Sequence, residues 1–347
     1  MRKRIKVLVV DDSLLFRKTL EQVLSKDVAI EVVGTAVDAY DARDKIIELN
    51  PDVMSLDVEM PRMNGIEFLK RLMPQHPMPV VVVSSINDNV FDAINAGAVD
   101  FVEKPKVTKP EDLDDFFREL TLKLKIASTA RLENKKKPVL TGRKKPLRKE
   151  GLGACQSIIA IGASTGGTEA VSEIIRSFPQ DMPPTLVVQH MPPVFTKLYA
   201  ERLNKLCQVE VKEAEDEDWL LPGRVIIAKG GFQMKLVKKS NGYQVQVYEG
   251  DKVNGHCPSV EPMFETVAEL FGEQAIGIIL TGMGTDGAKG LLDMRKAGAF
   301  TIGQDEKTSV VYGMPKAAYN MGAVMTQASL QKIPEIIFDH LNKMKGR

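Results

Sequence analysis

The sequence predicts an α/β protein built from two successive domains, each with a doubly wound and mostly parallel sheet. Two observations support this class. In both halves of the 347-residue chain, short apolar runs alternate with stretches of helical periodicity, as in βαβ units. A basic stretch that lacks acidic residues separates the two halves, between Glu133 and Glu150.

The first half contains five strand–helix units. The expected strands are 5–10, 30–37, 52–58, 79–85 and 99–104, and the expected helices are 13–25, 41–49, 65–73, 88–96 and about 111–126. The strands are largely apolar, as in a parallel sheet that is covered on both faces. Five units in about 125 residues indicate a flavodoxin-like (βα)5 domain over residues 1–125.

Residues 126–155 are expected to form a basic interdomain linker. Their central part, NKKKPVLTGRKKPLRK, has eight lysine or arginine residues, two prolines and no acid. A solvated linker is the simplest interpretation, and a docking site for an anionic partner is the alternative. No aromatic residue interrupts the run, so stacking on nucleic-acid bases has no support.

The second half alternates again over residues 156–347. The expected strands are 157–163, 185–190, 209–214, 224–229 and 275–282, and helical patterns cover about 168–177, 195–205, 262–272, 286–297 and 314–321. Residues 234–250 instead alternate apolar and polar around Asn241-Gly242, which is the strongest short hairpin signal. We therefore expect a doubly wound, mostly parallel α/β domain with an antiparallel hairpin.

Bulk composition limits the class of protein. The formal net charge is +1, which argues against a general binder of nucleic acid or membrane surfaces. Three scattered cysteines fit a reducing compartment. No stretch approaches the roughly 20 apolar residues of a membrane span. We expect a cytoplasmic protein with no nucleic-acid partner and no direct membrane insertion.

Charged and hydroxyl side chains follow the strands of the first domain. Asp11 and Asp12 come after the first strand and Asp57 ends the third. Ser84 ends the fourth strand, and Lys104 ends the fifth. The carboxyl ends of parallel strands meet at one edge, where three carboxylates repel each other unless a hard cation such as Mg²⁺ neutralises them. A carboxylate beside that ion can attack a phosphoryl donor.

Ser164 is the candidate nucleophile of the second domain. It lies in 162-GASTG-166, between an expected strand and an expected helix, and this matches G-x-S-x-G. An anion-binding turn and a purely structural turn are the alternatives. No lysine follows Gly167, and the spacing does not fit G-x-G-x-x-G, so neither nucleotide-loop fingerprint is complete.

A serine nucleophile needs a base and an acid that orients the base. His190 ends the strand after the one that leads to Ser164, and consecutive units usually place their strands side by side. His256, in a loop, is the rival base. Asp286 follows the strand 275–282 and is the preferred acid, with Asp251 and Asp305 as weaker rivals. The order Ser…His…Asp differs from that of α/β-hydrolases.

The first half resembles the receiver domain of bacterial response regulators. VVDDS, LDVEMPRMNG, VVSS and EKP carry the resemblance, which covers about residues 4–125. It implies phosphorylation at Asp57, Ser84 as the switch hydroxyl, Phe101 at the aromatic switch position and Lys104 as the partner of the phosphate. It further implies that Mg²⁺ is held by the following groups: Asp12, Asp57, the Glu59 backbone carbonyl and, through water, Asp11.

The second half resembles the catalytic domain of the chemotaxis protein-glutamate methylesterase (CheB) family. The motifs are IGASTGG, VQHMPP, NGH-x-PSV, LTGMGTDG and QDEKTSVVYGMPKAA. The resemblance implies a Ser164–His190–Asp286 triad, with the Met283 backbone N–H in the oxyanion hole. Cys257 stands where a basic residue is typical.

The family also implies partners and regulation. The substrates would be methylated chemoreceptors, with deamidation of receptor glutamines as a second reaction, and the phosphodonor would be a chemotaxis histidine kinase. The ester hydrolysis would need no cofactor. The unphosphorylated receiver would cover the catalytic crevice. Two other classes of protein are the alternatives. One is a regulator whose second domain binds nucleic acid, but no basic recognition helix follows residue 151. The other is a nucleotide-binding regulator that uses residues 162–167.

Overall fold

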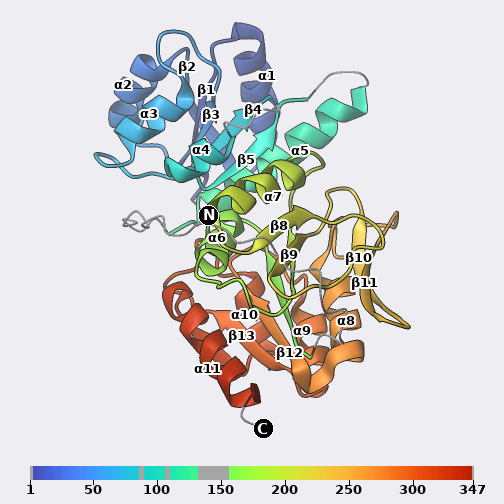
Figure 1. The fold of residues 1–347 in the computed structure, drawn as a ribbon. Helices are drawn as coiled ribbons and strands as arrows, with labels where there is room; N and C mark the ends of the chain where they lie inside the picture. Colours follow the sequence, from blue (N-terminus) through green and yellow to red (C-terminus); the bar gives the residue numbers. More distant parts are fainter. Residues whose placement is uncertain (1–2, 86–89, 106–109, 132–155, 346–347) are drawn as a thin grey trace. The chain divides into compact units, whose positions relative to one another are not determined.

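The computed structural model describes residues 3–85, 90–105, 110–131 and 156–345. Contacts divide the chain into two compact units, Met1–Asn134 and Lys135–Arg347, and each has its own sheet and core (Figure 1). The basic stretch between Glu133 and Glu150 lies outside the described residues, so the linker over 126–155 remains a prediction.

The first unit is a five-stranded parallel sheet with the order β2-β1-β3-β4-β5, which is the flavodoxin-like order and confirms that prediction. Its elements are β1 (Ile5–Val10), α1 (Leu14–Leu24), β2 (Ile30–Ala36), α2 (Ala39–Leu49), β3 (Val53–Asp57), α3 (Gly65–Leu72), β4 (Val80–Ser84), α4 (Val90–Asn95), β5 (Asp100–Glu103) and α5 (Pro110–Ala127). Helices α1 and α5 pack together through Phe16 and Phe116, whose ring centroids are 5.7 Å apart. Strands β3 and β4 are buried along their whole length, so the sheet is covered on both faces.

The second unit is a seven-stranded parallel sheet with the order β14-β13-β12-β6-β7-β9-β8. Its strands are β6 (Ile158–Ala163), β7 (Thr185–Gln189), β8 (Glu210–Glu213), β9 (Arg224–Ile227), β12 (Ala275–Ile279), β13 (Phe300–Gln304) and β14 (Thr326–Ala328). Its α-helices are α6 (Gly167–Arg176), α7 (Phe195–Leu206), α8 (Val260–Phe271), α9 (Ala288–Lys296), α10 (Met314–Asn320) and α11 (Ile333–Lys345), with short 3₁₀ turns at Gly272–Gln274 and Leu330–Lys332. β6 lies between β7 and β12, and this central position decides where the site forms.

Two strands of this sheet were not predicted from the sequence. β13 is FTIGQ and β14 is TQA; neither has the continuous apolar run that marks a buried strand. Both strands form by pairing with their neighbours. β13 pairs with β14, with Ile302 beside Thr326, and with β12, with Phe300 beside Ile276. Tertiary pairing therefore overrides a weak local signal here.

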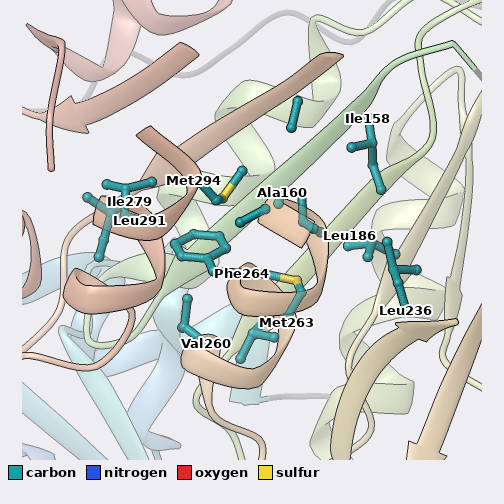
Figure 2. Close-up of a cluster of buried hydrophobic side chains, with 14 of the residues drawn as sticks. Ile158, Ala160, Leu186, Leu236, Val260, Met263, Phe264, Ile279, Leu291 and Met294 are labelled. Carbon is teal, nitrogen blue, oxygen red and sulfur yellow. The ribbon is translucent and has the colours of Figure 1, made fainter. Parts of the chain in front are cut away.

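The predicted hairpin is confirmed. β10 (Gln233–Lys239) and β11 (Gly242–Tyr248) pair antiparallel, with Lys239 opposite Gly242 at the turn. Helix α8 packs between this hairpin and the central strands, with its buried face formed by Val260, Met263 and Phe264 (Figure 2). The first turn of α8 is thus fixed by a well-packed core, which matters because that turn contacts the candidate site.

Within the described parts of the chain, no helix combines the length and the apolar character that crossing a membrane would require.

Candidate active site

Three loops meet where adjacent strands of the second sheet end. β6 pairs with β7 on one side and with β12 on the other. Ser164 directly follows β6, His190 directly follows β7, and Asp286 lies between β12 and α9. The prediction that the strands leading to Ser164 and His190 are neighbours is confirmed. The carboxyl edge of this sheet therefore presents a hydroxyl, an imidazole and a carboxylate.

Ser164 sits on a tight turn between β6 and α6. Its backbone N–H donates to the carbonyl oxygen of Thr281 (3.0 Å), and its own carbonyl accepts from the N–H of Gly167 (2.7 Å). Gly166, with φ of +76°, provides the left-handed residue that begins the helix. Ser164 is half-buried, and no described residue forms a hydrogen bond with its Oγ. The hydroxyl is thus held on a fixed backbone.

One amide ties the Ser164 turn to the His190 loop. Nε2 of Gln189, a buried residue at the end of β7, donates to the carbonyl oxygens of Ser164 (2.9 Å) and His190 (3.2 Å). The backbone N–H of His190 also donates to Ala163 (3.1 Å). These bonds fix the two loops relative to each other without using either functional side chain.

The imidazole of His190 is bound to Asp286. Nε2 of His190 and Oδ2 of Asp286 are 2.8 Å apart. Because a carboxylate only accepts hydrogen bonds, Nε2 carries the proton of the neutral ring and Nδ1 carries the free lone pair. Nδ1 is buried and has no hydrogen-bond partner among the described residues. His190 therefore has an unused basic nitrogen, as a general base requires.

Asp286 is a buried carboxylate that is fully hydrogen-bonded. Its oxygens accept from four donors: His190 Nε2 (2.8 Å), Asn254 Nδ2 (2.9 Å), Ser259 Oγ (2.6 Å) and the backbone N–H of Val260 (2.7 Å). Burial alone would raise the pKa of Asp286, but the bond to His190 and those to Asn254 and Ser259 outweigh it and hold the pKa well below its usual range. Asp286 thus stays ionised beside the imidazole.

Met283 lies on the loop that leads from β12 to Asp286. Its neighbour Gly282 donates to Val311 (3.0 Å) and accepts from Gly313 (3.1 Å) and Met314 (2.7 Å). The Met283 backbone N–H has no acceptor among the described residues, and the side chain is 45% exposed. The Met283 N–H is therefore available to an incoming oxyanion.

Sequence reasoning missed the residues that support Asp286. Asn254 was not singled out, although Asn254-Gly255 is the same hairpin signal as Asn241-Gly242. Ser259 is the N-cap of α8, which begins at Val260 rather than at the predicted residue 262, and a serine before a helical pattern is a start signal. His256, the rival base, lies against His190 with ring centroids 3.6 Å apart.

A second carboxyl group lies next to this site. Glu261 is 6% exposed, and its Oε2 accepts the backbone N–H of Gly287 (3.0 Å). Its Oε1 is buried without a partner among the described residues. Burial and the nearby charge of Asp286 raise the pKa of Glu261 to about 7. Glu261 therefore changes charge near neutral pH, beside a carboxylate that does not.

The first sheet gathers acidic groups at its carboxyl edge. The carboxylate oxygens of Asp11, Asp12 and Asp57 lie within 4.8 Å of one another. Lys104 Nζ pairs with Asp57 (2.6 Å) and Asp11 (2.9 Å). Burial raises the pKa of Asp57 to about 6, against the lowering effect of Lys104. Three carboxylates of this spacing fit the all-oxygen coordination of Mg²⁺.

Two other predicted residues of the first unit, Ser84 and Phe101, belong to β4 and β5. Ser84 is fully buried, and its Oγ donates to the carbonyl of Ser85 (3.0 Å). Ser85 Oγ in turn donates to the Glu59 side chain (2.6 Å). Phe101 is 3% exposed and packs edge-on against Phe91, with centroids 6.2 Å apart. The ring of Phe101 therefore points into the interior of the first unit.

The fold and the two sites define a class: a receiver-like unit with an acidic pocket, joined to a hydrolase-like unit with serine, histidine and aspartate at one sheet edge. Family models agree with both halves. The response regulator receiver domain model matches residues 7–116, and the CheB methylesterase model matches residues 159–337. The chain belongs to the CheB methylesterase family.

Relatives match along the whole chain. A protein-glutamate methylesterase/protein-glutamine glutaminase of Syntrophomonas wolfei is 57% identical over 345 residues, covering 99% of both chains. One of Syntrophotalea carbinolica is 51% identical over 352 residues, covering 99% of this chain and 100% of the relative. The crystal structure of the Thermotoga maritima CheB methylesterase catalytic domain is similar, with 39% identity and a TM-score of 0.52 over 53% of this chain and 97% of that one.

Proposed function

We propose that Ser164, His190 and Asp286 form the catalytic triad by which this chain hydrolyses glutamate methyl esters on chemoreceptors. The chain is a protein-glutamate methylesterase and protein-glutamine glutaminase with a receiver domain. One observation carries the assignment of residues. His190 binds a buried carboxylate through Nε2, and its buried Nδ1 has no partner among the described residues. His190 follows β7, the strand that pairs with the one leading to Ser164.

The reaction has two halves. Ser164 Oγ attacks the γ-carbonyl carbon of the methylated glutamate, and its proton passes to Nδ1 of His190. The carbonyl π electrons move to oxygen, where the Met283 N–H stabilises the oxyanion. The C–O bond to the methoxy group then breaks, and methanol leaves with the proton from Nδ1. Water repeats the sequence on the acyl-enzyme and releases glutamate.

Asp286 has two effects on this cycle. It fixes the tautomer of His190, and it stabilises the imidazolium that forms when Nδ1 takes the proton. The low pKa of Asp286 keeps it ionised throughout. A receptor glutamine follows the same path, with ammonia in place of methanol as the leaving group.

The receiver would control this activity through Asp57, with a chemotaxis histidine kinase as the phosphodonor. Asp11, Asp12, Asp57 and the Glu59 backbone carbonyl would hold Mg²⁺, which supplies charge neutralisation during phosphoryl transfer. Lys104 is in contact with the Asp57 oxygen and can pair with the phosphoryl group. Ser84 and Phe101 would change position with phosphorylation, a population shift of the receiver.

The test is methanol release from membranes that contain methylated chemoreceptors, with and without a phosphodonor. We expect release to increase with the phosphodonor and to vanish in Ser164→Ala. The matched control is Ser177→Ala at the other end of α6, where the hydroxyl donates to the carbonyl of Ile174. Near wild-type release by Ser164→Ala would exclude this serine as the nucleophile.

A further inference from the structure

The segment before α8 forms a tight turn that faces the catalytic pair. Val253 and His256 exchange two backbone hydrogen bonds, N–H to O of 3.0 Å and 2.9 Å. Between them, Asn254 and Gly255 both have positive φ, +52° and +84°. Two positive φ angles at an Asn-Gly pair are what a type I′ turn requires. The backbone of this turn is therefore specified by its own sequence.

Gln233, the first residue of β10, holds the segment in place. This side chain is 1% exposed. Its Nε2 donates to the carbonyls of Asp251 (3.0 Å) and His256 (3.1 Å), and its Oε1 accepts the N–H of Ser259 (2.9 Å). A single buried amide thus fixes the segment before, within and after the turn.

The turn contacts both members of the catalytic pair. Asn254 Nδ2 donates to Oδ1 of Asp286 (2.9 Å). Two residues on, the ring of His256 stacks on that of His190, with centroids 3.6 Å apart and planes 11° apart. Imidazole lone pairs and N–H bonds lie in the ring plane. Rings stacked face to face in this way do not exchange a proton directly, so the contact of His256 with His190 is a packing contact.

We propose that His256 is a positioning residue for His190, presented by the Asn254-Gly255 turn; this inference rests on the proposed function. The bond from Nε2 to Asp286 fixes one atom of the His190 ring but does not stop the ring from tilting about that bond. A parallel ring at van der Waals distance blocks the tilt on one face. The direction in which Nδ1 points is then restricted, and the proposed proton transfer from Ser164 depends on that direction, so its loss slows the reaction.

The test uses the full chain, activated by a phosphodonor, and methanol release from methylated chemoreceptor membranes. The variants are His256→Ala, which removes the ring, and His256→Phe, which keeps a flat ring without nitrogen. The control is His340→Ala. His340 also stacks on a ring, that of Phe300 (4.2 Å, 9°), but Phe300 is the first residue of β13 and lies at the opposite edge of the sheet.

We expect His256→Ala to lower kcat roughly 10- to 100-fold with KM changed less than about 2-fold, because orientation in the transition state is lost and not binding. His256→Phe should recover kcat to within about 3-fold of the wild type, since an aromatic ring of similar breadth restores the stack. His340→Ala should match the wild type. A wild-type kcat in His256→Ala, or His256→Phe as slow as His256→Ala, would overturn the proposal.

Two further measurements separate this inference from the proposed function. Activity that persists in Ser164→Ala would refute the nucleophile, whatever the His256 variants do. NMR relaxation of the His190 ring reports the motion of the ring without turnover. We expect a restricted ring in the wild type and in His256→Phe, and motion of larger amplitude in His256→Ala, with Nε2 bound to Asp286 in all three. Equal ring motion in the wild type and in His256→Ala would contradict the positioning role.

Discussion

His190 and Asp286 are joined by a 2.8 Å contact although the strands that lead to them are separated by β6. The strand between them, β6, is the one that leads to Ser164. The loops after three neighbouring strands therefore carry the three proposed triad residues to one edge of the sheet. Triads are recognised by geometry and role, so the order of these residues along the chain does not decide the assignment.

Asp286→Asn should lower kcat by roughly 10³- to 10⁴-fold, as in serine proteases in which an amide replaces this acid. The four groups around Asp286 all donate, and an asparagine has only one acceptor atom to offer them. Its NH₂ group would face donors, and His190 would lose the bond that fixes its tautomer. Methanol release under phosphodonor activation measures the loss.

The control for Asp286→Asn is Asp251→Asn. On sequence grounds Asp251 is a rival for the acid of the triad. In the structure it is exposed, and it binds Gln233 through its backbone carbonyl and not through its side chain. We expect activity close to the wild type. Equal losses in the two variants would mean that a general effect on the fold, not the triad, explains the result.

Gly282→Ala should reduce both activity and stability. A Cβ at this position would lie 2.7 Å from the Cβ of Ser164 and 2.4 Å from the Sδ of Met314, so the nucleophile turn or the 281–284 loop would have to move. Gly322→Ala is the matched control: a Cβ there meets nothing within 4 Å, but φ is +74°. It should cost about 1 kcal/mol of unfolding free energy from backbone strain alone and leave kcat unchanged.

The sole tryptophan, Trp219, lies in the second unit, so its fluorescence during urea unfolding reports the stability of that unit. A wild-type kcat in Gly282→Ala would show that the position of Ser164 does not depend on the absence of a side chain at residue 282.

Most of the elements could be predicted because buried parallel strands leave continuous apolar runs. The positions of Ser164 and His190 after their strands, and of Asp286 in the loop after β12, could be predicted for the same reason. The support of Asp286 could not. Asn254 and Ser259 reach it from a segment about 30 residues away in sequence, and their identity as donors depends on tertiary placement. The turn itself could be predicted, since Asn254-Gly255 is a hairpin signal. Nothing in the local sequence predicts that this turn binds Asp286.

His256 illustrates the same limit. From sequence, a histidine in a loop and a histidine at a strand end are both candidate bases, and only the strand-neighbour rule favours His190. Only the structure shows that the ring of His256 stacks on that of His190, with centroids 3.6 Å apart. Strands β13 and β14 could not be predicted for a related reason. They form by pairing with neighbouring strands, and their own sequences carry little strand signal.

Removal of residues 1–147 should raise the activity found without a phosphodonor by roughly tenfold or more, a coupling of at least about 1.4 kcal/mol. The expectation follows from inhibition by the unphosphorylated receiver. Each unit has its own sheet and core, so the remainder is expected to fold. Asp57→Asn in the full chain is the companion variant, and it should stay at the unstimulated rate when the phosphodonor is added. A truncated chain no faster than the unphosphorylated whole would refute inhibition by the receiver.

Glu261→Gln should stabilise the second unit at pH 8 and weaken the dependence of its stability on pH. The pKa of Glu261 is raised from 4.5 to about 7 in the folded protein, so folding favours the protonated form. The resulting stability is fully present below pH 4.5 and is lost as the pH rises through about 7. At pH 8 the wild type buries a charge beside Asp286, at a cost of about 3 kcal/mol, which a neutral amide avoids while still accepting from Gly287.

Urea unfolding followed by Trp219 fluorescence between pH 4.5 and 8 measures this effect. The control is Glu265→Gln, one turn further along α8, where the side chain is 46% exposed and pairs with Lys289 at the surface. We expect that control to shift stability by no more than about 0.5 kcal/mol at any pH. If Glu261→Gln and the wild type lost stability in parallel between pH 4.5 and 8, the titration would have to belong to another group.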